Sequence, residues 1–305
     1  CETAAVPPFV VSDEGPGPLL ATCAPLQLCF HCARGTETLN LSRLTQTQQS
    51  VKVLDFCRGV ESVRTLDAGA LGKWAALERV DLGGLSHCEV IETNFLCGAV
   101  KLAAVDLRGL RRCKNIAWDF LASCTALTEV DLSPLVECET VCNTLCYHCT
   151  SLRTASLANM RSLQSIGFML FRGCSALTSV DLAGLTSVTA IGKGAFYECT
   201  ALRSLDLSDL TTCVRIGPMF AYGCSSLTCV NLSGLRACEE VGTAFLRGCE
   251  ALTNVDMSAM GECRKIGDEF LRGCTALTTL DLRGMAKCEE VRGLNFLEGT
   301  KGLTR

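Results

Sequence analysis

Cysteine and histidine are the residue types of this chain with the most obvious capacity for chemistry. The 305-residue sequence contains 23 cysteines and three histidines. Cys29 and Cys32 flank His31 in a Cys-x-x-Cys arrangement, and Cys23 lies nearby. One such pair falls short of the four well-spaced ligands of a typical zinc site. Zinc binding, a disulfide and simple burial are three alternatives for this cluster, and we assign no metal or cofactor.

Other signatures of an active site are missing from the sequence. His87 and His148 neither recur nor lie near a nucleophile motif, and there is no Gly-rich phosphate-binding loop or His-Glu-x-x-His sequence. Carboxylates recur in register, so none is singled out as a paired acid and base. The sequence therefore predicts that the chain is not an enzyme.

Charge and hydropathy narrow the class of partner. The net charge is −4 and the pI is near 5.5, so no general attraction to nucleic acid or to an anionic membrane is expected. No apolar run approaches the ~18 residues that a membrane-spanning helix needs. These features therefore do not point to nucleic acid or to a membrane as the partner.

The elements that would position functional residues follow a repeat of 25 residues. A leucine returns at Leu77, Leu102, Leu127, Leu152, Leu177, Leu202, Leu227, Leu252 and Leu277. A β-branched residue returns at Ile91, Ile116, Val141, Ile166, Ile191, Ile216, Val241, Ile266 and Val291. A fixed period of this size is typical of stacked-repeat proteins, in which each short unit buries its apolar face against its neighbours.

One repeat unit contains two extended pieces joined by turns. Val180 and Leu182 should point inward and Asp181 outward, because side chains alternate along a strand. A second extended piece follows, and a short helical run such as residues 244–248, with Phe245 facing the core, closes the unit. We therefore predict an α/β solenoid, a right-handed superhelix of about ten 25-residue coils with a parallel sheet. At a strand spacing of ~4.8 Å the rod would be roughly 50 Å long.

The first 50 residues differ from the rest of the chain. They are rich in proline and glycine before residue 20, and they copy the repeat only once. We predict an N-terminal arm and cap over residues 1–50 and a solenoid over residues 51–305. Because the chain starts at Cys1 and ends at Arg305 without a visible polar cap, we expect a fragment or a processed chain. Uncapped solenoid ends would be open to self-association.

One repeat carries Leu-x-x-Val-x-Leu followed by Ile-Gly-x-x-Ala-Phe-x-x-Cys. The residues are Leu177, Val180, Leu182, Ile191, Gly192, Ala195, Phe196 and Cys199. This pattern resembles a leucine-rich repeat of the BspA-like type over roughly residues 51 to 305. The unit is about two residues longer than that type and has additional cysteines, so the cysteine-containing leucine-rich repeat is the second choice. The resemblance implies a protein-binding or adhesive surface rather than chemistry.

Fourteen cysteines fall into two columns of the repeat. The first column holds Cys124, Cys149, Cys174, Cys199, Cys224, Cys249 and Cys274, and the second holds Cys88, Cys113, Cys138, Cys213, Cys238, Cys263 and Cys288. Apolar residues replace cysteine in other copies, so we predict buried free thiols, which behave as small hydrophobes. A spacing of ~4.8 Å between rungs is also wider than a relaxed disulfide prefers. Free thiols favour an intracellular location, whereas the family resemblance makes a cell-surface or secreted location the alternative.

Acidic residues recur at one outward strand position, which we call the acidic strip. Its members are Asp81, Asp106, Asp131, Asp181, Asp206, Asp256 and Asp281, with Ser156 and Asn231 in the gaps. Like charges about 5 Å apart repel by roughly 0.8 kcal/mol even in water, so the strip needs a reason. Each side chain could accept backbone N–H groups of the following turn, as Ser and Asn also can. Otherwise the strip is a docking site for a basic partner or for Ca²⁺.

All three tyrosines of the chain fall in one further column, which we call the tyrosine–arginine column. It reads Tyr147, Arg172, Tyr197, Tyr222, Arg247 and Arg272. Tyrosine and arginine are enriched at binding hot spots, and one repeat apart they could form cation–π contacts. The column is either a partner-binding edge or an amphipathic cover for the turns beneath it.

The predicted function is a non-enzymatic module that binds a protein partner on one face of the solenoid. The tyrosine–arginine column and the acidic strip are the candidate surfaces. The alternative is a structural spacer or surface adhesin within a larger protein or assembly.

Overall fold

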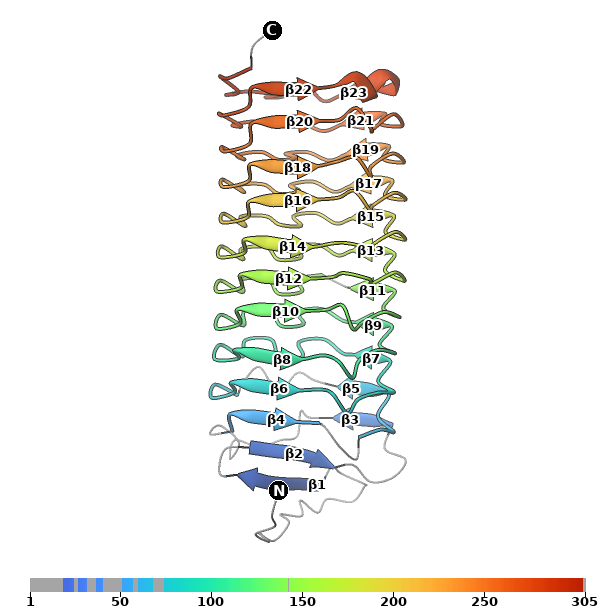
Figure 1. Cartoon of the computed structure of the whole chain (residues 1–305), viewed down its shortest axis with the longest axis vertical. Helices are drawn as coiled ribbons and strands as arrows, with labels where there is room; N and C mark the ends of the chain where they lie inside the picture. The colour runs from blue at the N-terminus through green and yellow to red at the C-terminus, as the bar shows by residue number, and fades with distance from the viewer. Residues whose placement is uncertain are drawn as a thin grey trace.

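The chain forms a rod of stacked turns (Figure 1). The computed structural model describes residues 19–24, 27–31, 37–40, 51–56, 60–67, 74–141 and 143–303. Each regular turn contributes one strand to each of two columns, and nine turns follow the 25-residue register, from β6–β7 to β22–β23. The predicted solenoid of parallel strands is confirmed.

Short strands make up both columns. The first column contains β2 (Gln27–His31), β4 (Val53–Asp55), β6 (Arg79–Asp81), β8 (Ala104–Asp106), β10 (Glu129–Asp131), β12 (Thr154–Ser156), β14 (Ser179–Asp181), β16 (Ser204–Asp206), β18 (Cys229–Asn231), β20 (Asn254–Asp256) and β22 (Thr279–Asp281). The second contains β3 (Thr38–Asn40), β5 (Thr65–Asp67), β7 (Val90–Ile91), β9 (Asn115–Ile116), β11 (Thr140–Val141), β13 (Ser165–Ile166), β15 (Ala190–Ile191), β17 (Arg215–Ile216), β19 (Glu240–Val241), β21 (Lys265–Ile266) and β23 (Glu290–Val291). At the N-terminal end, β1 (Leu19–Ala24) pairs antiparallel with β2.

Strand pairing in the regular turns joins residues 25 positions apart. Val130 pairs with Ala155, for example, and Val141 with Ile166. The second column is one sheet from β3 to β23, whereas the first is interrupted between β8 and β10, β14 and β16, and β18 and β20. Val180, in β14, is only partly buried where the sheet is interrupted.

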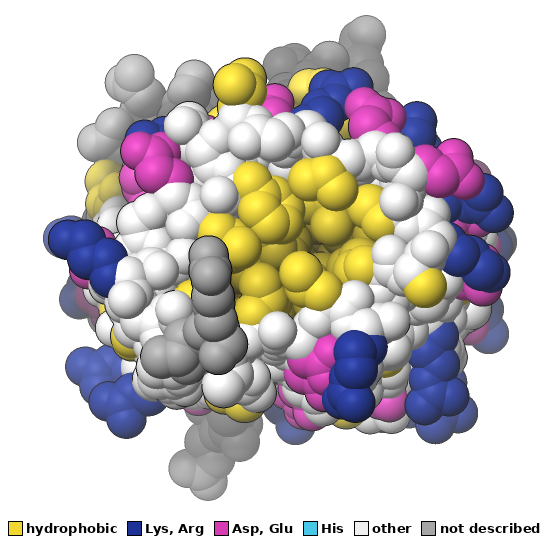
Figure 2. All heavy atoms as spheres, turned by 90° about the horizontal axis from the view of Figure 1, so that it is seen from above, with side chains coloured by type: hydrophobic (Ala, Val, Ile, Leu, Met, Phe, Trp, Pro, Cys, Tyr) yellow, Lys and Arg dark blue, Asp and Glu magenta, His cyan; other side chains and the backbone are white. Residues whose placement is uncertain are grey.

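The hydrophobic core runs along the centre of the rod. Leu127, Leu152 and Leu177 are fully buried, and the in-register pairing of the strands that follow them places them one above another. The buried rings of Phe220 and Phe245 stack with their centroids 5.6 Å apart. Figure 2 looks along the rod and shows hydrophobic side chains gathered in the centre, ringed by polar and charged ones. The stacking predicted from the repeat is therefore present.

The segment that closes each turn is not helical, so the expectation of a helical run over residues 244–248 is wrong. Ala244 and Leu246 have left-handed φ angles of 60° and 54°. The N–H of Ala244 donates to the carbonyl of Asp268 in the next turn, and that of Leu246 donates to Phe220 in the previous turn. Bonds to both neighbouring turns replace the bonds that a helix would make within itself. Within the described residues the structure has one helix, the short 3₁₀ helix η3 (Arg283–Lys287).

A column of glycines follows the second strand because successive turns approach closely there. A Cβ atom on Gly192 would lie 2.6 Å from the carbonyl carbon of Gly167, and one on Gly217 would lie 2.7 Å from that of Gly192. Both distances are far below van der Waals contact, so a side chain would push the turns apart.

The strand columns begin within the segment predicted as an arm and cap. β2 pairs with β4, and β3 pairs with β5. Residues 41–50 lie outside the described parts of the chain, so the boundary at residue 50 stays a prediction. Cys23 lies in β1 and Cys29 in β2, whereas Cys32 lies outside the described residues.

Candidate functional site

The acidic strip occupies the last residue of the first-column strands. Every member accepts a hydrogen bond through Oδ1 from the backbone N–H two residues ahead. The distances are 2.8 Å at Asp81, 3.0 Å at Asp106, 2.9 Å at Asp131, 3.0 Å at Asp181, 2.9 Å at Asp206, 2.8 Å at Asp256 and 2.9 Å at Asp281. Asn231 and Ser156 make the same bond at 3.1 and 3.3 Å. The hydrogen bond on which the first predicted role depends, an acceptor for the N–H of the following turn, is therefore present at every position of the strip. The stabilising effect of the bond stays a prediction.

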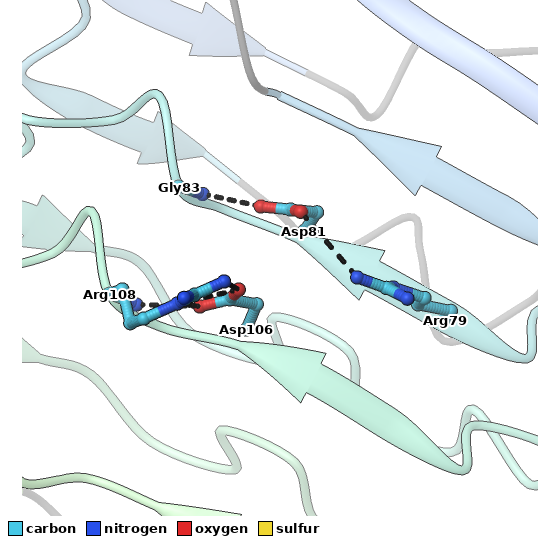
Figure 3. Close-up of polar contacts among 5 residues, drawn as sticks. All are labelled: Arg79, Asp81, Gly83, Asp106 and Arg108. Carbon is cyan, nitrogen blue, oxygen red and sulfur yellow. Dashed lines mark hydrogen bonds and ion pairs between the residues drawn. The ribbon is translucent and has the colours of Figure 1, made fainter.

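Arginines pair with the strip near its N-terminal end (Figure 3). Arg108 donates through Nε and Nη2 to the carboxylate of Asp106, while Arg79 lies 3.8 Å from Asp81. Hydrogen bonding to Arg108 holds the pKa of the Asp106 carboxyl below its usual value. These carboxylates are therefore partly neutralised by their own neighbours.

The strand face is hollowed between β8 and β14. Its residues line a depression of ≈ 630 Å³, to which Ala155 and Ser156 of β12 contribute small side chains. Asp131 and Asp181 line the same depression and are exposed. Asp131 and Asp181 are therefore accessible to a partner at this depression.

The tyrosine–arginine column forms a continuous stack. The guanidinium carbon of Arg172 lies 5.8 Å from the ring centroid of Tyr147 and 4.6 Å from that of Tyr197. The Tyr197 and Tyr222 rings are stacked at 4.7 Å with an interplanar angle of 6°. Arg247 lies 5.1 Å from the Tyr222 centroid. All five side chains are half-buried. The stack aligns residues that span 100 positions of the sequence, from Tyr147 to Arg247.

Carboxylates neutralise the arginines at the C-terminal end of this column. The carboxylate of Glu269 accepts a hydrogen bond from Nη1 of Arg247 at 2.5 Å and another from Nη1 of Arg272 at 2.8 Å. Nε of Arg272 also lies 2.9 Å from Glu298. Burial raises the pKa of Glu269, but the hydrogen bonds from both arginines outweigh it, so that pKa lies below its usual value.

Arg172 has a different environment from the other two arginines. No carboxylate of the described residues lies within 4.0 Å of its guanidinium group. Its Nε is buried without a hydrogen-bond partner in that part of the chain, and Nη1 contacts Sδ of Met169 at 3.5 Å. Arg172 is thus a stacked cation with no counter-ion from the described chain.

Two exposed aromatic residues were missed by the sequence reasoning. Trp118 is 58% exposed and Phe168 is 54% exposed. They occupy the same outward position two turns apart, where other repeats have residues such as Asn143 and Lys193. The signal in the sequence is a large aromatic residue at an outward position of the repeat.

The cysteine columns are buried as predicted and also act as hydrogen-bond donors. Their thiols are free, and only Cys288 is partly exposed. First-column thiols donate to a carbonyl of the preceding turn, as Cys199 does to Phe171 at 3.0 Å. Second-column thiols donate two residues ahead, as Cys213 does to Arg215 at 3.5 Å. Burial raises the pKa of Cys213 to about 11, so this thiol stays protonated and is a poor nucleophile at neutral pH.

The described residues contain no group of three or more His, Cys, Asp and Glu side chains that could hold a metal ion. Cys32 is not among them, so the cysteine cluster near the N-terminus is not covered by this observation. No helix in the described ranges is both long and apolar enough to cross a membrane.

The last turn leaves apolar side chains exposed at the end of the rod. Leu294 is 70% exposed and Val291 is 52% exposed, while Phe296 packs against the core but is only partly buried. Self-association through this end stays a prediction.

Comparison with protein families identifies the repeat. The model of the BspA type leucine-rich repeat region, with six copies, matches residues 59–178 and 139–278. This chain belongs to the BspA-type leucine-rich repeat family. The match spans most of the regular turns and confirms the resemblance read from the sequence. Leucine-rich repeat proteins generally serve in protein interaction or surface adhesion and are generally non-enzymatic.

Several solved bacterial structures are similar to this BspA-type chain. A leucine-rich repeat protein from Bacteroides ovatus is 16% identical, with 100% of this chain and 93% of that chain covered and a TM-score of 0.45. One from Eubacterium ventriosum is 11% identical, with 95% and 94% covered and a TM-score of 0.44. The Treponema pallidum leucine-rich repeat protein is 22% identical, with 76% and 86% covered and a TM-score of 0.39. Comparison with curated proteins gave no match.

Proposed function

We propose that this chain is a non-enzymatic module that binds a protein partner through the tyrosine–arginine column. The observation that carries the proposal is the unbroken stack of side chains from Tyr147 to Arg247. Four steps of ~4.8 Å make this stack about 19 Å long. A surface of this length offers several adjacent aromatic and guanidinium anchors to one partner.

Order in the free protein supports the use of this surface for binding. Each ring or guanidinium group of the stack is held by its neighbours, so its rotamer is restricted before a partner arrives. Binding then costs less conformational entropy than it would with mobile side chains. Half-burial leaves apolar ring surface available to a partner, which is the environment in which tyrosine and arginine act as hot spots.

The acidic strip is the less favoured surface because its carboxylates already have local roles. Oδ1 of Asp181 accepts the N–H of Ala183, and Oδ1 of Asp131 accepts that of Ser133. A basic partner would have to use the second carboxylate oxygen or compete with the turn. The strip is therefore a suitable control surface for experiments on the column.

Paired surface variants test the proposal. Tyr197→Ala with Tyr222→Ala removes the centre of the stack, while Asp181→Asn with Asp206→Asn changes the strip and keeps its acceptor oxygens. Immobilised wild type and both variants would be incubated with an extract of the organism that makes the protein. Quantitative mass spectrometry would then compare the retained proteins, and thermal melts would establish that each variant is folded.

We expect at least one protein to be retained by the wild type and the strip variant but lost from the folded tyrosine variant. Equal retention by the tyrosine variant, or selective loss from the strip variant, would contradict the assignment of the binding surface to the column.

A further inference from the structure

The three arginines of the tyrosine–arginine column differ in how their charge is balanced. Arg247 and Arg272 share the carboxylate of Glu269, and Arg272 also contacts Glu298. Arg172 lies against tyrosine rings as Arg247 does, yet it has no ion pair within the described chain. The difference arises within one column, so neighbouring residues must produce it.

The residues around Arg172 explain the missing counter-ion. Met169 precedes Arg172 by three positions, as Glu269 precedes Arg272. Gly194 follows Arg172 by 22 positions, as Glu269 follows Arg247. Both positions that correspond to Glu269 are therefore occupied by uncharged residues around Arg172. Met169 and Glu269 share nearly the same left-handed backbone, with φ angles of 57° and 58°, so the backbone does not exclude a glutamate at position 169.

The tyrosine rings hold the Arg172 guanidinium group in place but do not neutralise it. Tyr147 and Tyr197 lie 5.8 and 4.6 Å from its central carbon. The buried Nε has no partner in the described structure, and Nη1 has only a weak sulfur acceptor. Because Nε is buried, the two Nη groups are the donors left for a partner. A partly desolvated cation is stabilised by an anion that can accept two N–H groups, and a carboxylate matches the two Nη groups in this way.

We propose that Arg172 is the recognition centre of the column and binds an Asp or Glu side chain in an acidic segment of the protein partner. The inference rests on the proposed function of the column. A carboxylate is favoured over a doubly charged phosphate because the site offers one uncompensated guanidinium group. Arg247 and Arg272 lack this capacity because Glu269 already balances their charge.

A random linear peptide library displayed on phage provides the probe. The library would be selected on the full chain, and each enriched peptide would be synthesised together with its counterpart in which Asp and Glu are replaced by Asn and Gln. We expect the enriched peptides to contain an acidic residue and to lose about tenfold or more in affinity when that residue is neutralised.

Variants of the chain locate the acid-binding residue. Arg172→Gln should weaken the acidic peptides about tenfold or more, and Arg172→Lys should weaken them less because charge is kept while the planar fork is lost. Met169→Glu should weaken them as strongly as Arg172→Gln while Arg172 is retained, because it supplies an internal counter-ion. Met169→Gln is the matched control and should leave affinity within about threefold. Thermal melts check that every variant is folded.

Each contrary outcome has a defined meaning. The assignment of Arg172 would be overturned if the library gave no enrichment or if the enriched peptides lacked acidic residues. It would also be overturned if Arg172→Gln bound the peptides as tightly as the wild type does. If the enriched peptides do not depend on Arg172 but still depend on Tyr197 and Tyr222, only this inference fails and the proposed function stands. Peptides that are insensitive to Arg172→Gln and also to the tyrosine double variant would place binding elsewhere and contradict both.

Discussion

The acidic strip and the tyrosine–arginine column are both files of outward-facing residues with the same 25-residue spacing, yet their side chains bond in different directions. Strip residues such as Asp131 bond to the backbone two positions ahead, within their own turn. Column residues such as Tyr197 contact the equivalent residues of the turns above and below. A polar residue that recurs in every turn can therefore stabilise each turn separately, or it can form one extended surface across many turns.

This difference determines how each file should respond to substitution. A strip residue contributes to folding through a local hydrogen bond, so its loss should affect stability more than binding. A column residue contributes to a surface shared by several turns, so its loss should affect binding more than stability. Four measurements test this comparison, in order of decreasing expected effect.

The largest effect on stability should come from Asp131→Ala in the strip. Removal of the carboxylate leaves the N–H of Ser133 without its acceptor, and we expect the free energy of unfolding to fall by about 1–2 kcal/mol. Asp131→Asn keeps an acceptor oxygen and should stay within about 0.5 kcal/mol of wild type. Urea denaturation measures both. A gain in stability for Asp131→Ala would show that relief of charge repulsion outweighs the turn hydrogen bond.

Glu269→Gln should have a smaller effect on stability and a new effect on binding. The side chains of Glu269 and Arg247 are 22% and 29% exposed, so we expect their ion pair to contribute about 0.5–1 kcal/mol. The substitution also leaves Arg247 without a counter-ion, as Arg172 is in the wild type. The variant should therefore gain a second site for acidic peptides, detected as a change in binding stoichiometry by calorimetry. Unchanged stoichiometry would show that a missing counter-ion is not sufficient for recognition.

Acid should destabilise the rod gradually by protonating carboxyl groups of the acidic strip and of the tyrosine–arginine column's ion pairs. The pKa of Asp281 is lowered by its hydrogen bond to Arg283, and that of Glu269 by its two arginines despite its burial. A carboxyl group with a lower pKa in the folded state stabilises it fully above the unfolded pKa of about 4, and this contribution is lost as pH falls through the folded pKa. The melting temperature should therefore fall as pH drops below about 4. Asp281→Asn should flatten this dependence, and a melting temperature independent of pH in that range would contradict it.

The smallest effect should come from Tyr222→Phe. The ring remains available to stack on Tyr197 and beneath Arg247, so stability and partner affinity should both stay close to wild type, within about 0.5 kcal/mol. Tyr222→Ala should lose the stack and its contribution of about 0.5–1.5 kcal/mol. If Tyr222→Phe weakened binding as much as Tyr222→Ala, the phenol hydroxyl rather than the stack would be the recognition element.

Much of this molecule could be anticipated from its period. Leu127, Leu152 and Leu177 had to stack because each short unit needs neighbours to bury its apolar side chains. The hydrogen bond that Asp181 accepts from the N–H of Ala183 was also foreseeable, because the Asp, Ser and Asn side chains found at equivalent positions have in common only the ability to accept an N–H group. The closing segment was mistaken for a helix because Phe245 and Leu246 are both apolar, and alternating left-handed residues leave no clear pattern in an L-amino-acid sequence.

The sequence by itself determined which residues lie above one another along the rod, since a strict period assigns every side chain to a column. Only the tertiary structure decided which members of a column are neutralised. Arg172, Arg247 and Arg272 are equivalent by position, but the carboxylate that separates them reaches Arg247 from the next turn and Arg272 from within its own. Ion pairing depends on distances of a few ångströms between particular atoms, and a repeat pattern does not specify such distances.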